Sequence, residues 1–325
     1  MARIVSLGAA LQNIYLIDHD DLTSTMMGDS AIFGKIVAGG KYEIDRIKYE
    51  IGGGGINSAI TFARNGHESI LMANIARDEA GDTVISALDR EGVDSSYVNN
   101  SVFRTTGTSV ILLDSNRGER TILTYPGASK KFDNLKEDDL ELIQPDWLHV
   151  TSVGGDIELL QRFFKKAHEL GTKIMFNPGI KEFERGSELI VLLSEVDVLI
   201  VNKAEASLLV PGTLLTEIMY HLENYVPGIV IVTDGVMGGI AGKHSEKEYY
   251  RFGIYEDVKV QDVTGAGSAF SSGFLAAYAN GKNFHDSLVF ASANATSVVK
   301  SVGANGGILT GNEDLHMMPM QKLTF

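Results

Sequence analysis

The sequence predicts an α/β fold in which a mostly parallel central sheet is covered by helices on both faces. From about residue 140 onward, short uninterrupted runs of Val, Ile and Leu alternate with segments whose apolar residues recur at helical spacing. Strands that are apolar throughout are typical of parallel sheets buried on both faces, which gives three layers. A second observation is that residues 13–50 and 105–126, approximately, break this rhythm and predict a small additional β-sheet.

Each element of the repeating part has its own local signal. Residues 4–7 predict a first buried strand, and the amphipathic segment 157–170 predicts a helix that stops at Gly171, because glycine is favoured just after a helix end. The other expected strands are 147–150, 173–178, 198–202 and 229–233, and the other expected helices are 186–195, 214–224 and a segment from Lys203 onward.

The two irregular stretches predict a lid. Residues 32–40 and 42–51 mix apolar and charged side chains in near alternation, as half-exposed antiparallel strands do. Two more strands are expected near 107–114 and 119–125, on either side of a turn at 115–118. We expect residues 1–325 to form a single domain, with this small sheet lying over the main sheet. A peripheral hairpin extension is the alternative interpretation.

Composition excludes several classes of protein. The net charge of the 325 residues is −14 and no basic block of five or more occurs, so no nucleic-acid partner is expected. The chain has no cysteine, which excludes disulfides, thiolate catalysis and cysteine-ligated zinc. No run approaches eighteen apolar residues, and the first apolar run is too short for a signal peptide. We therefore expect a cytoplasmic protein without a membrane span.

The most informative motif is a glycine-containing bend before a helix. A strand is expected to end at Asp262, and an apolar helical segment follows the bend at once; the run reads Asp262, Val263, Thr264, Gly265, Ala266, Gly267, Ser268. Such a bend presents free backbone N–H groups beside a helix N-terminus, where unpaired donors and the helix dipole stabilise an anion.

This run closely resembles the D-T-x-G-A-G-D signature of the ribokinase-like (PfkB) family of sugar and nucleoside kinases. The resemblance implies a ribokinase-like sandwich with a β lid, and transfer of the γ-phosphoryl group of ATP to a primary hydroxyl of a sugar or nucleoside. It places Gly265, Ala266 and Gly267 at the reaction centre. In the family the last Asp of the signature is the catalytic base, and this chain has Ser268 there.

Two further motifs match the family's nucleotide and metal elements. Asn202 and Glu205 stand where a buried strand ends and a helix begins, and they match an N-x-x-E element that organises Mg²⁺-bound water and phosphate. Mg²⁺ prefers few carboxylates and several waters, so this pair suffices chemically. Thr233, Gly235 and Gly238 match a T-x-G-x-x-G element that lies against the nucleotide phosphates.

Three more residues complete the expected ATP and metal site. Thr264 belongs to the bend and is expected to contact the nucleotide, while Asp262 at the strand end is expected to orient metal-bound water. Asn294, on an apolar helix, matches the family's helix beside the adenine; a helix-surface role is its alternative. Glu205 as an ordinary first-turn acid is likewise the alternative to a metal role.

The expected acceptor site combines a glycine cluster with polar side chains. Gly53 and Gly54 precede a helix, allow close backbone approach, and with Asn57 resemble the G-G-x-x-x-N element that holds sugar hydroxyls. A dinucleotide loop looks similar, but the acid expected about twenty residues later is missing, so a dehydrogenase ranks far behind. Asn13 stands at the family's substrate-binding Asp, and Arg120 is either a further substrate contact or part of a plain turn.

Ser268 decides how active the chain should be. Serine accepts no proton at neutral pH without a base of its own, and losing general-base help costs about 10²–10⁴-fold in rate. The sequence leaves three explanations open: a deliberately inactivated variant, a pseudokinase that binds ligand with a regulatory role, or a slow kinase. A Val/Ile-rich lid sheet could also pair with a second copy, so a homodimer through the lid is considered.

Overall fold

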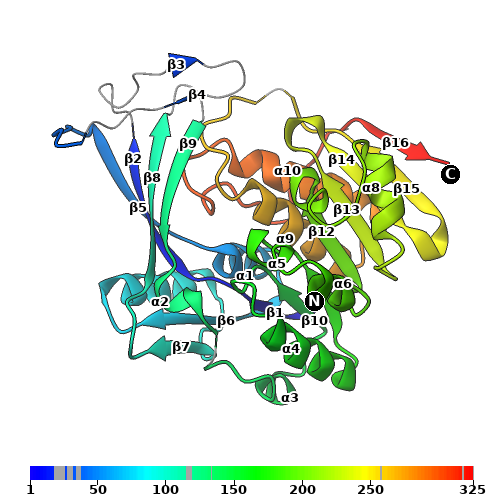
Figure 1. The fold of residues 1–325 in the computed structure, drawn as a ribbon, viewed down its shortest axis with the longest axis horizontal. Coiled ribbons are helices and arrows are strands. Elements are labelled where there is room, and N and C mark those ends of the chain that lie inside the picture. The colour runs from blue at the N-terminus through cyan, green and yellow to red at the C-terminus, as the bar shows by residue number, and fades with distance from the viewer. Residues whose placement is uncertain are drawn as a thin grey trace.

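A ten-stranded sheet forms the centre of the computed structural model, which describes residues 1–17, 26–27, 32–33, 38–114, 119–132, 134–256, 258–316 and 318–324. Seven strands of this sheet, β7, β6, β1, β10, β11, β12 and β13, pair in parallel, and β14, β15 and β16 continue it antiparallel (Figure 1). In spatial order the strands are β16 (Met320–Leu323), β15 (Glu248–Phe252), β14 (Gly239–Lys243), β13 (Ile229–Thr233), β12 (Val198–Asn202), β11 (Lys173–Phe176), β10 (Trp147–Val150), β1 (Arg3–Leu7), β6 (Glu68–Ala76) and β7 (Val98–Ser101).

Helices cover both faces of this sheet, which explains why its strands are apolar throughout. Every residue of β10 is buried, as are four of the five in β13. One face packs against α1 (Gly54–Arg64), α2 (Glu79–Glu91), α9 (Ala266–Ala279) and α10 (Phe284–Val298). The other packs against α3 (Asp139–Ile143), α4 (Ile157–Leu170), α6 (Ser187–Leu193) and α8 (Leu215–Leu222). The predicted three-layer α/β architecture is confirmed.

Short helices fill the remaining connections. They are α5 (Ile180–Phe183), α7 (Lys203–Ala206), and the 3₁₀ turns η2 (Gly127–Lys130), η3 (Gly235–Met237) and η4 (His244–Glu246). The long α4 shows how local sequence sets a helix end. The Asp156 carboxylate accepts the N–H of Leu159 at 3.0 Å, and Gly171 ends the helix with φ 71°. Gly171 lies where the sequence predicts the end of this helix.

A separate four-stranded sheet stands beside the main sheet (Figure 1). Its order is β5 (Arg46–Gly52), β2 (Leu11–Ile17), β8 (Gly107–Asp114) and β9 (Glu119–Tyr125). Side chains alternate between its two faces. Tyr15 and Ile111 lie on the inner, buried face, while Tyr49 and Leu123 are 59% and 56% exposed on the outer face. The predicted small sheet is therefore present.

Three local predictions need correction. Residues 42–45 are irregular, and within 32–40 the described strand is only β4 (Ile32–Phe33), which pairs with β3 (Met26–Met27). Asn13 lies inside β2 and not in a turn. No strand ends at Asp262, because β15 ends ten residues earlier and an irregular segment follows. The predicted turn at 115–118 lies outside the described residues.

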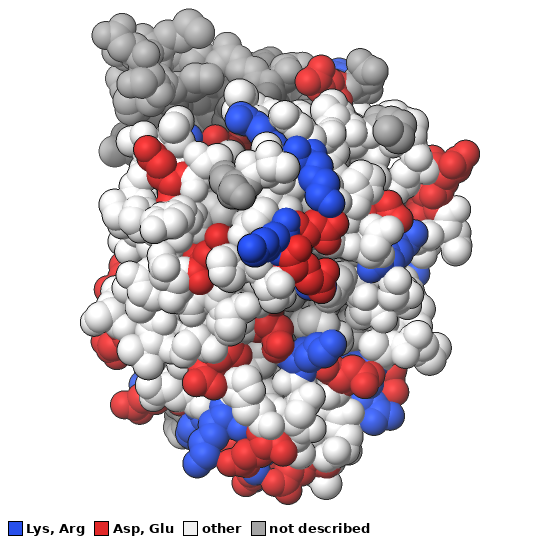
Figure 2. Space-filling view, turned by 90° about the vertical axis from the view of Figure 1, so that its right-hand side faces the viewer, with Lys and Arg blue, Asp and Glu red and all other residues white. Residues whose placement is uncertain are grey.

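The described surface mixes charges of both signs. Figure 2 shows Lys and Arg side chains interspersed with Asp and Glu over one face. Among the described residues, no helix combines the length and apolar character that a membrane crossing requires.

A buried polar cluster lies between the main sheet and α1. His149 on β10 is fully buried, and its ring meets that of Phe62 edge to face at 5.4 Å. Its register partner on β1 is Ser6, and Ser58 lies one helical turn before Phe62. Both ring nitrogens and both serine hydroxyls are buried without a hydrogen-bond partner among the described residues. Burial lowers the pKa of His149 to about 3, so the imidazole is neutral in the folded protein.

This cluster predicts a loss of stability in acid. The unfolded chain binds a proton at His149 below about pH 6.5 while the folded chain does not until about pH 3, so stability present above pH 6.5 declines as the pH falls. We expect His149→Leu to flatten the decline by up to about 1.4 kcal/mol per pH unit between pH 6 and pH 4. Urea unfolding at several pH values measures it. Phe164→Leu, a core change without a titrating group, should keep the wild-type slope, and an unchanged slope in His149→Leu would contradict the assignment.

Candidate active site

Two adjoining cavities lie at the carboxyl ends of the central strands. A polar cavity of about 340 Å³ is lined by residues that follow β10, β11 and β12, and an apolar cavity of about 240 Å³ lies beside β13 and α10. Thr233, Val263 and Gly267 line both. The carboxyl edge of a parallel sheet is where α/β proteins bind ligands, and a ligand with one apolar and one polar end could span this junction.

The bend at Gly265–Ser268 forms the junction between the cavities. Gly265 begins α9 with φ 85°, and no side chain caps this helix end in the described chain. A Cβ on Gly265 would lie 2.5 Å from that of Ala304, whereas one on Gly267 would meet nothing within 4 Å. The first N–H groups of a helix have no intrahelical partner, so this open helix end suits an anion.

Asp262 holds the bend in place through backbone hydrogen bonds to its carboxylate. It is fully buried, and its carboxylate accepts the N–H of Thr264 at 2.8 Å and the N–H of Gly303 at 3.1 Å. Neither Asp262 nor Thr264 lines a cavity, although the Thr264 hydroxyl is buried without a partner among the described residues. Burial and the nearby Asp262 charge raise the pKa of Tyr15, which approaches from β2. The carboxylate thus joins the bend to the 301–303 loop.

Ser268 lines the polar cavity at the first turn of α9. Its carbonyl accepts the hydroxyls of Ser271 at 3.1 Å and Ser272 at 2.7 Å, which stabilises the turn. Glu205 is the one carboxylate among the described residues that line this cavity, and no histidine lines it. Ser268 therefore has no strong base beside it from the described lining.

Asn202 and Glu205 cap one another at the start of α7. The Asn202 Oδ1 accepts the N–H of Glu205 at 2.8 Å, and a Glu205 carboxylate oxygen accepts the N–H of Asn202 at 3.0 Å. Both residues line the polar cavity, and burial raises the pKa of Glu205. Glu205 thus acts as an acidic residue in the first turn of a helix, which the sequence analysis gave as the alternative to a metal role. One carboxylate beside an amide and open space also fits Mg²⁺, which keeps most of its waters.

The glycine cluster lies where the small sheet meets α1. Gly53 has φ 100°, and a Cβ there would lie 2.4 Å from the Ala9 carbonyl oxygen, so the backbone itself requires glycine. Gly54 lines the polar cavity, whereas Gly53, Asn13 and Asn57 stand behind the lining. The Asn57 Oδ1 is buried without a partner among the described residues. Asn13 packs against Gly52, which brings the predicted acceptor residues together.

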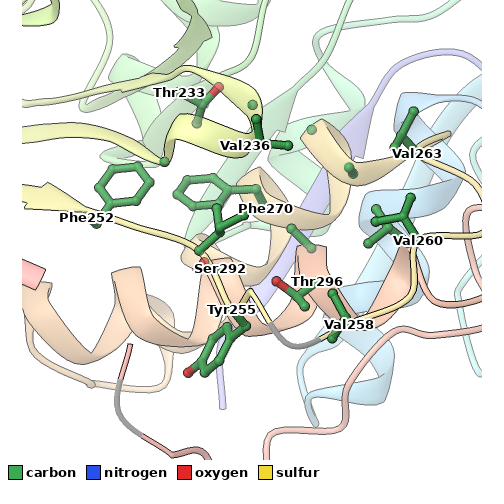
Figure 3. A pocket seen from close by; sticks show the side chains of 17 residues that line it. Thr233, Val236, Phe252, Tyr255, Val258, Val260, Val263, Phe270, Ser292 and Thr296 are labelled. Atoms are coloured by element: carbon green, nitrogen blue, oxygen red, sulfur yellow. The ribbon is translucent and has the colours of Figure 1, made fainter. Parts of the chain in front are cut away.

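The apolar cavity has the walls of a site for a flat ring. Phe252 and Phe270 stack with centroids 5.4 Å apart and an interplanar angle of 18°. Figure 3 shows these rings at one end and Val258 and Val260 at the other. Thr233, Gly235, Gly238 and Ala266 also line it.

Asn294 does not line this cavity. It is fully buried within α10, its amide nitrogen donates to the Ala269 carbonyl at 2.8 Å, and its amide oxygen accepts the N–H of Leu309 at 2.8 Å. Both ends of the amide are therefore used in holding α9, α10 and the C-terminal segment together.

Comparison with known proteins identifies the family. Residues 2–310 match the model of the pfkB family carbohydrate kinases. The chain belongs to this family. It is 25% identical over 297 residues to a ribokinase of Haemophilus influenzae, covering 88% of this chain and 91% of that protein. It is 26% identical over 276 residues to a nucleoside kinase of Methanothermobacter thermautotrophicus, covering 82% and 83%.

Solved structures confirm the predicted ribokinase-like fold. The structure of Arabidopsis thaliana ribokinase in complex with ribose and ATP matches with a TM-score of 0.77 at 23% identity, covering 94% of this chain and 95% of that chain. The resemblance inferred from the Asp262–Ser268 run is therefore confirmed as a pfkB relationship over nearly the whole chain.

Sequence reasoning missed part of the lining of this pfkB site. Thr151 and Ser152 follow β10, and Asn177 follows β11, so all three lie at the carboxyl edge beside Asn202. The strand-end rule that singled out Asn202 could have found them too. Their neutral oxygens and amide are suited to hydrogen-bonding hydroxyl groups.

The two bend glycines predict different effects of an added methyl group. Gly265→Ala would force a positive φ on alanine and a clash with Ala304, so we expect a loss of about 1–3 kcal/mol of unfolding free energy. Gly267→Ala has open space and should stay within about 0.5 kcal/mol of the wild type. Urea unfolding of both variants measures this; equal stabilities would contradict the described bend.

Proposed function

We propose that this chain transfers the γ-phosphoryl group of ATP to a primary hydroxyl group of a sugar or nucleoside. The observation that carries the proposal is the uncapped start of α9 at the junction of an apolar cavity and a polar cavity. A nucleotide needs a dry pocket for its base and N–H donors for its phosphates, and the acceptor needs polar groups beyond them. The order of the two cavities matches the order of these parts.

The donor would lie with its adenine in the apolar cavity and its phosphates at the bend. The flat space beside Phe252 and Phe270 suits a purine, and Thr233, Gly235 and Gly238 line the path toward Gly267. ATP in the complex of the Arabidopsis thaliana ribokinase supports this donor. Thr264 and Asp262 would act by holding the bend in shape.

Glu205, with Asn202 acting through water, would hold Mg²⁺ in the polar cavity. When bound, the ion would neutralise charge on the phosphate oxygens. Asp262 is committed to two backbone N–H groups, so its geometry supports a positioning role more than a metal role.

The acceptor would occupy the polar cavity under the small sheet, which would act as a lid. Gly54 lines this space, and Gly53, Asn57 and Asn13 would support the lining from behind. The acceptor hydroxyl would lie beside Ser268, whose hydroxyl group accepts a hydrogen bond but removes no proton at neutral pH. Transfer should therefore be slow, driven by positioning and by charge stabilisation at the bend.

Restoring a carboxylate at the bend tests this proposal. We expect Ser268→Asp to raise the rate of ADP formation with Mg·ATP by about 10²–10⁴-fold, because the carboxylate supplies the missing general base. A coupled assay over a panel of ribose, fructose, adenosine and inosine measures the rate. Ser268→Asn, of the same size but without a basic group, serves as the matched control and should show no such gain.

The result separates a kinase from a binding protein. No gain in Ser268→Asp, together with calorimetric binding of an ATP analogue, would favour a binding or regulatory protein that keeps only the pocket. Absence of analogue binding with Mg²⁺ present, for every acceptor, would leave the nucleotide site without support.

The outer face of the small sheet is proposed as a homodimer contact. Ile47, Tyr49, Leu123 and Tyr125 are each more than half exposed there, and Ile14 lies between Tyr49 and Val110 in the pairing register. Exposed apolar groups in a continuous row are typical of association surfaces.

Charge placed on this face should dissociate the dimer. We expect sedimentation velocity to show a wild-type dimer at micromolar concentration, and Leu123→Glu to raise the dissociation constant about 100-fold because a carboxylate would be buried unpaired. Leu142→Glu on α3, an even more exposed leucine away from this sheet, is the control. A monomeric wild type would refute the contact.

A further inference from the structure

An arginine whose Nε has no hydrogen-bond partner among the described residues faces the polar cavity from the small sheet. Arg120 lies on β9 opposite Leu113 of β8, whose side chain is buried on the inner face, so the pairing register turns Arg120 inward as well. It is half-buried and lines the polar cavity together with Ser268 and Glu205. A guanidinium group is thus built into the wall opposite the bend.

The guanidinium has an unused donor. Its Nε is sealed from solvent and has no hydrogen-bond partner among the described residues. Four other described arginines, Arg3, Arg64, Arg162 and Arg185, each form a salt bridge with a glutamate, whereas Arg104 also has a buried nitrogen without a partner in the described chain. A buried donor without a partner is costly, and it is commonly satisfied by a ligand.

Arg120 and Glu205 are the only charged residues among the described ones that line this cavity. The Glu205 carboxylate accepts the N–H of Asn202, and no ion pair joins it to Arg120. Asn13 and Asn57, on the acceptor side, are neutral too. The polar cavity therefore combines amide and hydroxyl groups, suited to sugar hydroxyls, with one free planar cation, suited to a carboxylate or phosphate.

We propose that the acceptor carries an anionic group, as a sugar acid or sugar phosphate does, and that Arg120 binds this group. The inference rests on the proposed function, because it takes the polar cavity as the acceptor site. The acceptor side is favoured over the ATP phosphates because Arg120 comes from the small sheet, whereas the open N–H groups of α9 already provide for the donor phosphates. Arg120 then determines specificity: its fork binds the anionic end and leaves the primary hydroxyl directed toward Ser268.

Matched pairs of acceptors test the proposal without turnover. Calorimetry compares fructose with fructose 6-phosphate and glucose with gluconate, each with the nucleotide site filled by an unreactive Mg·ATP analogue so that the bend takes no second anion. We expect the wild type to bind the charged member of at least one pair tenfold or more tightly than its neutral partner. Arg120→Met should reduce that preference at least tenfold, and Arg120→Lys, which keeps charge but not the fork, should restore part of it. Arg162→Met on α4 is the control for a lost surface arginine.

The outcomes are distinct. Equal binding of charged and neutral members by the wild type, or a preference that survives in Arg120→Met, overturns the anionic acceptor. If Arg120→Met keeps the preference for the charged acceptor and weakens only binding of the ATP analogue, the guanidinium contacts the donor phosphate. This result also overturns the anionic acceptor. Failure of the proposed kinase function shows separately, as absent binding of the Mg·ATP analogue on its own or as absent transfer in Ser268→Asp.

Discussion

The open start of α9 is the constraint on which the rest of the site depends. Backbone N–H groups left without partners lower the stability of the free protein, so they persist only where the surrounding structure holds them in place. Here Gly265 supplies the positive φ that turns the chain into the helix, and Asp262 ties the bend to the 301–303 loop through two hydrogen bonds. Because the loop before the bend is irregular, the buried carboxylate replaces the support that a strand would have given.

The scaffold and the site use different parts of the same elements. Apolar contacts hold strands β10 to β13 on both faces. The polar residues that line the cavity stand at or just after the ends of these strands, as Thr151, Asn177 and Asn202 show. The site is thus built from strand ends and helix starts, which can vary in sequence without disturbing the core. His149, a titratable group buried in β10, has no hydrogen-bond partner among the described residues and makes the stability of the core depend on pH.

Much of this structure could be predicted from the pattern of apolar residues and from the polar residues at strand ends. The strands around Leu148, Ile200 and Ile231 are continuous apolar runs, which the sequence predicts directly, and Asn202, Glu205 and Thr233 stand at or just after the ends of two such strands. Gly267 was singled out by its glycine-containing motif, because the segment before it is irregular. The wall of the apolar cavity formed by Val258 and Val260 was not predicted. These residues come from an irregular segment, and no sequence pattern places that segment beside Phe270. Asn294 shows the opposite limit. An amide side chain on an apolar helix gives the same sequence pattern whether it contacts a ligand or joins two helices. Only the packed structure shows which of these two roles Asn294 has.

The neutral residue at the bend and the free guanidinium opposite it have a common electrostatic consequence. Phosphoryl transfer proceeds through a loose transition state in which charge is spread over the phosphate oxygens, and the hydroxyl proton must also be accepted. A carboxylate at position 268 would help the proton step, but it would also repel both the phosphate and any anionic acceptor. Arg120 and Glu205 are the only charged residues among the described ones that line the polar cavity, and the neutral Ser268 adds no second carboxylate that would repel an anionic ligand. Under the two proposals, the missing base and the binding of a charged acceptor would both follow from the neutral residue at position 268.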